Sequence, residues 1–487
     1  MDDLVAELAG ALGEANVLVS AEEKAPLLCD WLGKYRGAAR AVIRPGSTAE
    51  VAAAMRICAR HNAPVVAQGG NTSMSGGATP DNSGRAVVLS LTRLNSIRNI
   101  DTVGNTIAVD AGVVLAKVQQ AAEEAGRFFP LSLGAEGSCT IGGNLAANAG
   151  GVAVLRYGTM RELTLGLEVV LADGRIWDGL TSLRKDNTGY ALRDLFVGSE
   201  GTLGIITGAV LKLFAPLRAR ATAFVAVQDI DAALALLAAI RNRCGDRLTA
   251  FEFMTGDCLA LILRHAEGIR LPLAAMPPAA VLIELSDQDD ETALGERLEA
   301  TLIGGVDAGL VIDAAVAQDG MQARAFWRVR ESISETLVRA GKAAKHDVSM
   351  PISAMAEFVA ATEAAVRAAA PGVRPIVFGH LGDGNLHYNL LPAEGQDPAA
   401  FAALAPELTR IVHDEIGRRR GSISAEHGIG QLRVDEMPLR KTPIELELMR
   451  SLKHLLDPAG LLNPGKLLPA GPCPLAPETE DDHGSAR

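Results

Sequence analysis

The placement of glycine constrains this chain more than any other feature of its sequence. Many of the 50 glycines gather in three segments, at residues 69–77, 134–151 and 198–208. Glycine has no Cβ, so clustered glycines mark places where the backbone turns tightly or lets another group come close. We therefore expect a fold that brings these segments against something other than an ordinary core.

The first glycine segment is typical of an anion-binding loop. Residues Gly69 to Ser73 (GGNTS) directly follow a predicted strand at 64–67. Consecutive glycine and asparagine residues can aim several backbone N–H groups at one anion, and neighbouring hydroxyl groups add donors. The natural ligand of such a nest is a pyrophosphate. Taken alone, the segment also fits an ordinary glycine-rich surface loop.

Two further segments favour a bound cofactor. Residues 130–151 form a nearly continuous run of small side chains, which lets the backbone lie flat against a large planar ligand. Residues 185–207 combine small residues with a β-branched end that suits an adenine or a ribose. The sequence contains no G-x-G-x-x-G pattern, so NAD bound in its usual mode is not expected.

The remaining pattern predicts an α+β protein of two or three domains, because 487 residues exceed the size of one compact core. Apolar periodicity and turn residues predict strands at 41–45, 64–67, 86–90, 106–111, 223–227, 280–285 and 309–313, helices at 47–62, 113–126, 229–242 and 354–370, and a hairpin that turns at Asp173-Gly174. The glycine-rich pattern ends near residue 216, where we expect a domain boundary.

Charge and composition argue against several classes of function. The 46 Lys and Arg residues against 58 Asp and Glu residues give a net charge of −12, which disfavours nucleic acid and anionic membranes. No stretch reaches the roughly 18 apolar residues that a membrane helix needs. The N-terminus, Met1-Asp2-Asp3, has the wrong charge for a targeting segment, and the six cysteines form no C-x-x-C pair. These features predict a cytoplasmic protein, with a disordered tail at 468–487.

The segment 378–390 (FGHLGDGNLHYNL) predicts a hairpin that carries histidines. Asp383-Gly384 is a strong two-residue turn signal. Counting outward from it pairs His380 directly with His387, on one face of the hairpin. Asn389 returns to that face, and the intervening leucines point into a core.

A second segment can complete a metal site. Residues 421–430 (GSISAEHGIG) place Glu426 and His427 between small residues that permit close approach. Two imidazoles and one carboxylate form an open three-ligand set that fits zinc, although Mn, Co or Fe would accept similar ligands. The alternative is a pair of hydrogen-bonded sheet histidines beside an unrelated glutamate.

Together, the three glycine segments resemble the FAD-binding domain of the vanillyl-alcohol oxidase/para-cresol methylhydroxylase superfamily. The resemblance covers the whole chain and implies an FAD-binding domain at 1–215, built of two subdomains. An α+β cap domain with an antiparallel sheet would follow at 216–445, and residues 446–467 would return to the FAD domain. It implies FAD contacts at Gly69, Gly70, Asn71, Thr72, Ser73, Gly76, Gly77, Pro130, Gly134, Ser138, Gly142, Gly143, Asn148 and Ile206. No histidine lies between His61 and His265, so a covalent histidine link from these segments is excluded and dissociable FAD is expected.

The histidine segments resemble one branch of that superfamily, the metal-dependent D-2-hydroxy acid dehydrogenases. That branch includes D-2-hydroxyglutarate dehydrogenase, D-lactate dehydrogenase and the glycolate oxidase flavin subunit. The resemblance implies His380, His387 and Glu426 as metal ligands and His427 as the catalytic base, in contact with substrate.

Two further segments, 326–334 (FWRVRESIS) and 345–351 (KHDVSMP), resemble the D-2-hydroxyglutarate dehydrogenase members. They imply substrate contacts at Arg330, Ser334 and Lys345, to which we add Asn389 on the histidine face. Serine at 334 replaces the family's threonine and keeps its hydroxyl group. Two cations near one ligand favour a dicarboxylate over lactate, whereas the alternative is that both are solvated surface charges.

The implied activity is oxidation of D-2-hydroxyglutarate to 2-oxoglutarate, with FAD as hydride acceptor. Within the enzyme class, the alternative is a D-lactate dehydrogenase or a glycolate oxidase flavin subunit. Outside it, the alternatives are a flavin-binding subunit of a larger membrane-associated complex that is inactive alone, or a metal-stabilised binding protein without turnover. The sequence has no internal iron–sulfur or haem motif, so an external acceptor is expected: an electron-transfer flavoprotein, a quinone or a cytochrome. A homodimer is a further expectation.

Overall fold

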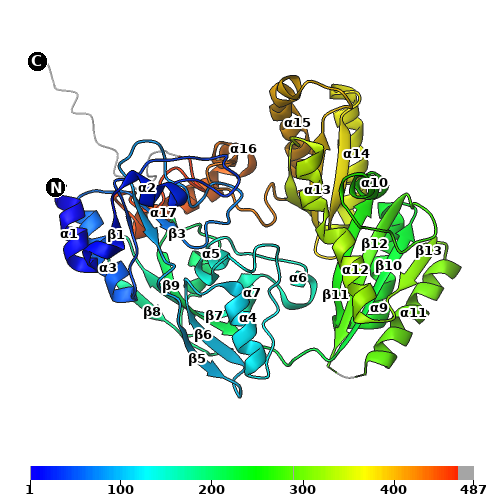
Figure 1. The fold of residues 1–487 in the computed structure, drawn as a ribbon, viewed down its shortest axis with the longest axis horizontal. Helices are drawn as coiled ribbons and strands as arrows, with labels where there is room; N and C mark the ends of the chain where they lie inside the picture. Colours follow the sequence, from blue (N-terminus) through cyan, green and yellow to red (C-terminus); the bar gives the residue numbers. More distant parts are fainter. Residues whose placement is uncertain (1, 289, 470–487) are drawn as a thin grey trace, which may run out of the picture.

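The computed structural model describes residues 2–288 and 290–469. Figure 1 shows two lobes: the blue-to-cyan N-terminal part on the left and the green-to-yellow part on the right. The orange and red helices α16 (Met437–Arg440) and α17 (Pro443–Leu456) lie back against the left lobe. The predicted tail lies outside the described residues from position 470 onward.

The first sheet of the left lobe leads into the first glycine loop. Its strand order is β1-β2-β4-β3, with β2, β4 and β3 parallel and β1 antiparallel at the edge. The strands are β1 (Val17–Leu18), β2 (Ala41–Ile43), β4 (Val87–Ser90) and β3 (Val65–Gln68). Helix α3 (Thr48–Arg60) connects β2 to β3, and the Ser47 hydroxyl caps it by accepting from the N–H of Glu50. Because β3 ends at Gln68, the segment from Gly69 begins at the edge of this sheet.

The second sheet of the left lobe is antiparallel, with the order β5-β6-β9-β7-β8. Its strands are β5 (Ile97–Asp101), β6 (Thr106–Asp110), β9 (Ile205–Lys212), β7 (Thr164–Val170) and β8 (Ile176–Gly179). Val170 pairs with Ile176 across the predicted turn, where Gly174 has a φ of +80°. The hairpin at Asp173-Gly174 is therefore confirmed.

The right lobe is built on a single antiparallel sheet with the order β13-β10-β12-β11-β15-β16-β14. Its strands are β13 (Asp313–Val316), β10 (Ala219–Val227), β12 (Ala279–Asp287), β11 (Leu248–Thr255), β15 (Arg374–His380), β16 (Asn385–Leu391) and β14 (Asp347–Ser349). The expected α+β class with an antiparallel cap sheet is confirmed.

Helices cover these sheets. They are α1 (Asp3–Leu12), α2 (Ala21–Lys24), α3 (Thr48–Arg60), α4 (Leu115–Glu124), α5 (Ile141–Ala146), α6 (Val154–Tyr157), α7 (Met160–Leu163), α8 (Arg193–Phe196), α9 (Ile230–Cys244), α10 (Gly256–His265), α11 (Glu291–Asp307), α12 (Gly320–Glu331), α13 (Ile333–Ala340), α14 (Met355–Ala369), α15 (Pro398–Arg418), α16 (Met437–Arg440) and α17 (Pro443–Leu456). Among the described residues, none of these helices is long and apolar enough to cross a bilayer.

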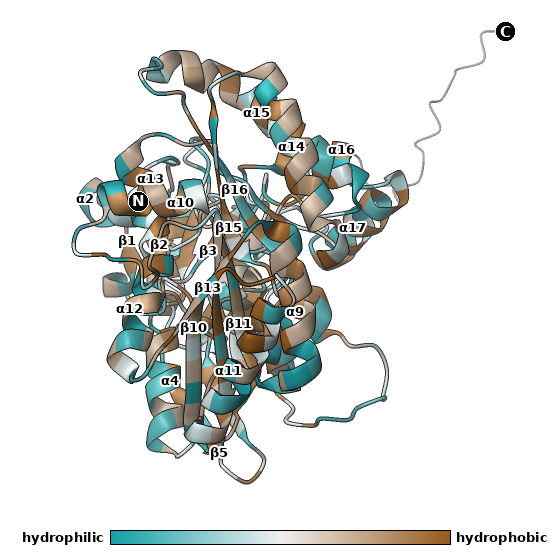
Figure 2. Ribbon diagram, turned by 90° about the vertical axis from the view of Figure 1, so that its right-hand side faces the viewer, coloured by the Kyte–Doolittle hydropathy of each residue, from teal (hydrophilic) through white to brown (hydrophobic). Residues whose placement is uncertain are grey.

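The two lobes have separate hydrophobic cores. The largest core of the left lobe runs from Leu4 to Leu213 and also takes in Leu462, which the chain supplies on its return. In the right lobe, two clusters pack on the two faces of the sheet. Figure 2 shows hydrophobic brown along the central strands and hydrophilic teal on stretches of the outer helices. The exact residues at which we predicted the domains to begin and end stay a prediction.

One predicted strand is displaced. We expected a strand at 309–313, but residues up to Asp307 belong to α11 and β13 begins at Asp313. The intervening residues form the exit turn of the helix: Gly309 has a φ of +70°, and the N–H of Leu310 donates to Gly305 O at 2.9 Å. The apolar residues that predicted a strand therefore follow this turn before β13 begins.

The predicted register of the histidine hairpin is also wrong. His387 pairs with Phe378, so His380 lies two residues further along the same strand. The turn spans residues 381–384, and within it the N–H of Asp383 donates to His380 O at 3.2 Å. Asp383-Gly384 is therefore the second half of a longer turn. A shift of two residues keeps the side chains on the same face, so both histidines and Asn389 still share one face.

Candidate active site

Three elements of the right lobe bring the predicted metal ligands together. One ligand atom from each of His380, His387 and Glu426 lies within 4.8 Å of the other two. Glu426 reaches both histidines from the loop after α15: its carboxylate oxygens lie 3.7 Å from His380 Nε2 and 3.8 Å from His387 Nε2. The two imidazole centroids are 5.8 Å apart. Two imidazole nitrogens and one carboxylate are a donor set that fits a divalent transition metal.

The surroundings of the two histidines shift their pKa values in opposite directions. Burial lowers the pKa of His387 to about 3, so this imidazole is neutral. Burial acts in the same direction on His380, but the charges of Glu252 and Glu426 outweigh it and raise the pKa of His380 to about 9. A metal ion would take the place of the proton on His380.

Glu252, on β11, is a site residue that sequence reasoning missed. Its carboxylate is buried (1 % exposed) and accepts from His380 Nδ1 at 2.7 Å and from Arg330 Nε at 2.8 Å. Burial would raise the pKa of Glu252, yet the charges of His380 and Arg330 lower it to about 2. A carboxylate thus fixes the ring that offers Nε2 to a metal, as outer partners of metal ligands commonly do. The available signal was an acidic residue between Phe251 and Phe253, inside an apolar strand.

Asp347, on β14, is the second missed residue. One of its oxygens accepts from the backbone N–H groups of Glu426 (2.8 Å) and His427 (3.0 Å), and the other accepts from Asn385 Nδ2 (2.9 Å). Burial would raise its pKa, but the charges of His427 and His387 lower it below the ordinary value. Asp347 therefore fixes the turn that carries both the third ligand and the predicted base.

The predicted base lies beside the ligand cluster. The ring of His427 stacks on that of His387 at a centroid distance of 6.1 Å, and its Nδ1 lies 3.6 Å from Asp347 Oδ2. Its side chain is 28 % exposed, more than the side chains of His380 and His387. A partly accessible imidazole with an ordered backbone can exchange a proton with a bound substrate.

Of the five predicted substrate residues, His427 lies in this cluster, Arg330 is joined to it through Glu252, and Asn389 lies on the hairpin face that carries both histidines. The Arg330 guanidinium lies over the Phe378 ring, 4.8 Å from its centroid. The Glu252 carboxylate lies between Arg330 and His380 and binds both. Asn389 is buried on the histidine face of β16. Within the described residues, no hydrogen bond or ion pair joins Ser334 or Lys345 to the cluster. Both residues are exposed, and burial of part of the Lys345 side chain lowers the pKa of its ammonium group.

The first glycine segment lines a cavity of about 570 Å³ in the left lobe. Its wall includes Gly69, Gly70 and Asn71 together with Ser138 from the second segment. A Cβ on Gly69 would lie 2.2 Å from Thr140 Oγ1, and one on Gly70 would lie 2.1 Å from Ser138 O. The backbone of the first segment thus packs closely on the Thr140 side chain and on the Ser138 carbonyl of the second segment. Thr140 Oγ1 is buried and has no hydrogen-bond partner within the described residues, so the cradle fits a ligand with polar oxygens.

The other predicted cofactor residues have different surroundings. Gly76 has a φ of +71° and adjoins Tyr35 and Gln431, while Gly77, Thr72 and Ser73 continue the same loop. Gly142 packs on Ala111, Pro130 is buried, and Gly134 and Gly143 are exposed. Asn148 Oδ1 accepts from Thr159 Oγ1 and from the N–H of Arg161, and Ile206 is buried in the core of β9. The Asn148 amide oxygen is thus hydrogen-bonded within the protein, and the Ile206 side chain packs in the core.

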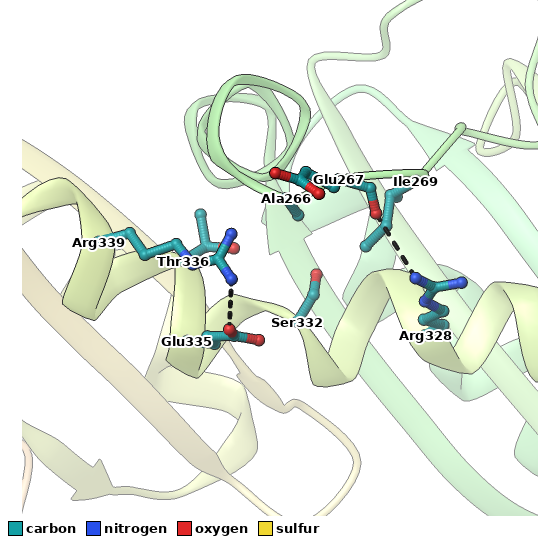
Figure 3. A pocket seen from close by; sticks show the side chains of 8 residues that line it. All are labelled: Ala266, Glu267, Ile269, Arg328, Ser332, Glu335, Thr336 and Arg339. Carbon is teal, nitrogen blue, oxygen red and sulfur yellow. Dashed lines mark hydrogen bonds and ion pairs between the residues drawn. The ribbon is translucent and has the colours of Figure 1, made fainter.

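A second cavity, of about 190 Å³, does not belong to this site. Figure 3 shows it between the loop after α10 and helices α12 and α13, with Arg339 bonded to Glu335 and Arg328 to Glu267 O. Arg330 lies two residues beyond Arg328, so it points to roughly the opposite side of α12. The cations of this cavity already have partners, and it holds none of the predicted site residues.

Two protein-family models match the chain. Residues 39–179 match a model described as an FAD binding domain, and residues 217–467 match a model described as the C-terminal domain of FAD linked oxidases. The fold is also similar to the solved structure of p-cresol methylhydroxylase, with a TM-score of 0.74, 17% identity and 96% of each chain covered.

Several similar curated proteins carry the name D-2-hydroxyglutarate dehydrogenase, whereas a relative from Schizosaccharomyces pombe, 36% identical (90% of this chain, 83% of the relative), is named a putative D-lactate dehydrogenase. The chain is 40% identical to a probable D-2-hydroxyglutarate dehydrogenase of Oryza sativa subsp. indica (96% of this chain, 82% of the relative). It is 42% identical to the D-2-hydroxyglutarate dehydrogenase of Bos taurus (93% and 81%) and 40% identical to that of Xanthomonas citri pv. viticola (90% and 91%).

The predicted cytoplasmic location is wrong by the same comparison. The rice and cattle relatives are named as mitochondrial enzymes. The acidic N-terminus, on which the prediction rested, is therefore not a guide to location here.

Both family models describe FAD-linked proteins, and the relatives are about 40% identical over most of the chain. The chain belongs to the FAD-linked oxidase family, together with the D-2-hydroxyglutarate dehydrogenases, and is an oxidoreductase that binds FAD.

Proposed function

We propose that this enzyme oxidises D-2-hydroxyglutarate to 2-oxoglutarate with the help of FAD and a divalent metal. The observation that carries the proposal is the convergence of His380, His387 and Glu426 beside His427. It occurs in a chain about 40% identical to D-2-hydroxyglutarate dehydrogenases.

The residues divide the chemistry among them. When bound, FAD supplies a hydride acceptor and a divalent ion supplies a Lewis acid that lowers the pKa of an alcohol. His380, His387 and Glu426 would hold the ion, for which zinc is our choice because it accepts this ligand set. His427 accepts the proton of the C2 hydroxyl at its ring nitrogen. Asp347 keeps that ring in place, because it accepts from the backbone N–H of His427.

Substrate selection would rest on Arg330, Ser334, Lys345 and Asn389. The Nε of Arg330 is held by Glu252, which leaves its terminal N–H groups for a distal carboxylate. A planar guanidinium fixed in this way can bind a carboxylate through two parallel hydrogen bonds. A monocarboxylate such as lactate would leave these donors without a partner.

FAD would be held without a covalent link, with its pyrophosphate at Gly69–Ser73 in the cavity of the left lobe. An external acceptor would reoxidise it, either an electron-transfer flavoprotein, a quinone or a cytochrome. A homodimer stays part of the proposal.

The test is anaerobic mixing of the purified yellow protein with D-2-hydroxyglutarate, L-2-hydroxyglutarate, D-lactate and glycolate. Flavin absorbance should bleach fastest with D-2-hydroxyglutarate, and 2-oxoglutarate should appear in equal amount. Faster bleaching with D-lactate or glycolate would move the enzyme to those substrates. If none of the four hydroxy acids bleaches the flavin absorbance, the protein does not have the proposed activity.

The role of His427 has its own prediction. His427→Ala should keep its metal and flavin but lose roughly 10²–10⁴-fold in the rate of flavin reduction, the usual contribution of a positioned base. Metal content, flavin content and the anaerobic rate check this. A variant that reduces its flavin at the normal rate would show that another group takes the proton.

A further inference from the structure

The loop that carries Glu426 and His427 is fastened to the FAD-binding lobe immediately after these residues. The N–H groups of Gln431 and Leu432 donate to Ser75 O at 3.0 and 3.2 Å. Gln431 Nε2 donates to Gly76 O at 2.8 Å and to Thr79 O at 3.2 Å. Ser75 and Gly76 belong to the first glycine segment, so this loop makes direct contact with the predicted pyrophosphate loop.

One carboxylate of the FAD-binding lobe holds the centre of this connection. Glu200 lies in the third glycine segment, and its Oε1 and Oε2 accept from the N–H groups of Ile429 and Gly430, both at 2.7 Å. Both side-chain oxygens are therefore used by the backbone of one loop. The loop also fits closely around the carboxylate, because a Cβ on Gly428 would lie 2.8 Å from Glu200 Oε1.

The backbone of Glu200 is held as firmly as its side chain. Glu200 has a φ of +52°, a conformation that glycine favours. Its carbonyl accepts from Asn463 Nδ2 at 2.8 Å, and the same amide nitrogen donates to Gly77 O at 2.9 Å. Glu200 thus connects the returning C-terminal segment, the glycine loop and the loop that follows His427.

Two carboxylates from different lobes therefore hold successive parts of one loop. Asp347 of the right lobe accepts from the N–H groups of residues 426 and 427, and Glu200 of the left lobe accepts from those of residues 429 and 430. We propose that Glu200 is a positioning residue for the oxidation step: it fixes the loop that carries Glu426 and His427 in register with the FAD-binding segments. This inference rests on the proposed function, because that function needs the base and the flavin to act on the same substrate carbon.

The expected effect follows from the sensitivity of such reactions to distance. A misplacement of about 1 Å between reacting groups can cost about 100-fold in rate. Replacing Glu200 by glutamine keeps its size but turns one acceptor oxygen into a donor, which opposes an N–H of the loop. The loop should then shift or fluctuate, while the two histidine ligands and the glycine segments keep their own contacts.

The experiment compares Glu200→Gln with Glu50→Gln in the full-length holoenzyme. Glu50 is a matched control, because its carboxylate also accepts a backbone N–H in the FAD-binding lobe, from Gly46 at 2.7 Å, but it does so at the start of α3. Metal and FAD content, anaerobic flavin reduction by D-2-hydroxyglutarate and its C2-deuterated form, and hydrogen exchange of the peptide spanning 426–432 are measured for both.

We expect Glu200→Gln to keep both cofactors, to lose roughly 10- to 100-fold in the rate of flavin reduction, and to show a larger isotope effect. KM should change little, and exchange of the peptide at 426–432 should become faster. Glu50→Gln should match the parent in all of these. A normal reduction rate, or a rate loss that only follows lost FAD or metal, would overturn the inference.

A second variant and the hydrogen-exchange measurement distinguish failure of this inference from failure of the proposed function. If Glu200→Gln does not fold, Glu200→Asp takes its place, since it keeps both acceptor oxygens and is one methylene shorter; an unchanged rate there would also overturn the inference. The exchange measurement needs no substrate, so unchanged exchange at 426–432 contradicts the role of Glu200 itself. Failure of the parent enzyme to reduce its flavin contradicts the proposed function instead.

Discussion

At the scale of single residues, Glu252 decides how the candidate site is charged. It is the buried partner of both Arg330 and His380. Removing one member of a buried ion pair leaves the other without a counter-charge, at a cost of about 3–5 kcal/mol. Groups that orient a metal ligand typically contribute about 10- to 100-fold to metal affinity. Glu252 should therefore affect both folding stability and metal binding.

We predict that Glu252→Gln lowers the free energy of unfolding by about 3–5 kcal/mol and weakens metal binding about 10-fold or more. Urea unfolding and metal content after dialysis measure the two effects. Glu394→Gln is the control, because Glu394 is also paired to an arginine, Arg264, but is 71% exposed. Tight metal binding by Glu252→Gln would mean that His380 is oriented without its carboxylate partner.

His346 should make the protein sensitive to acid. Its Nδ1 lies 2.7 Å from Tyr388 O and its Nε2 lies 3.0 Å from Thr409 Oγ1, and burial lowers its pKa from 6.5 to about 3. Between these two values the unfolded chain binds a proton that the folded chain does not. The contribution of His346 to stability is therefore fully present above pH 6.5 and is lost as the pH falls toward 3.

We predict that His346→Asn is less stable than the parent at pH 7.5 but loses less stability between pH 6.5 and pH 5. Asparagine keeps a donor for Tyr388 O and cannot be protonated in this range. Urea midpoints across the pH series check this, and His454→Asn, at an exposed position of α17, should leave the slope unchanged. Equal slopes for His346→Asn and the parent would show that other groups dominate the acid response.

At the scale of elements, the hairpin of β15 and β16 shows what the sequence could predict. Alternation of side chains along the strands correctly predicted that His380, His387 and Asn389 share a face. The direct pairing of the two histidines was wrong, because the length of the turn depends on contacts outside the hairpin. The turn packs on Met350, which precedes it by more than 30 residues: the N–H of Met350 donates to Gly384 O at 3.0 Å.

A substitution at Gly384 tests whether the hairpin turn depends on its contact with Met350. It has a φ of +91°, and a Cβ there would lie 2.4 Å from Met350 O, whereas Gly395 has a φ of +77° and open space around it. We predict that Gly395→Ala costs about 1 kcal/mol through its backbone alone, and that Gly384→Ala costs clearly more and also reduces metal content. Thermal unfolding and metal analysis compare the two variants. Equal losses would mean that the contact with Met350, the residue after β14, does not set the hairpin.

At the scale of the whole molecule, the candidate site is made from two lobes whose cores are separate. Short motifs predicted the cofactor loops, the metal ligands and the base, because each motif concentrates its residues within a few positions. Glu200, Glu252 and Asp347 were not predicted, because their carboxylates accept from residues 38 to 230 positions away in the chain. Such pairs depend on how the lobes and strands come together, which no local pattern encodes.

The separate cores also predict that the two cofactors can be removed independently. The ligand atoms come from β15, β16 and the loop after α15, whereas the glycine cradle belongs to the left lobe (Figure 1). Dialysis against a chelator should therefore abolish flavin reduction by D-2-hydroxyglutarate while the protein stays yellow with its full FAD content. Added Zn²⁺ should restore the rate in the parent but not in His387→Ala, which lacks one of the three ligands. Loss of FAD together with the metal would mean that the loop at 426–432 couples the two sites more strongly than their separate cores suggest.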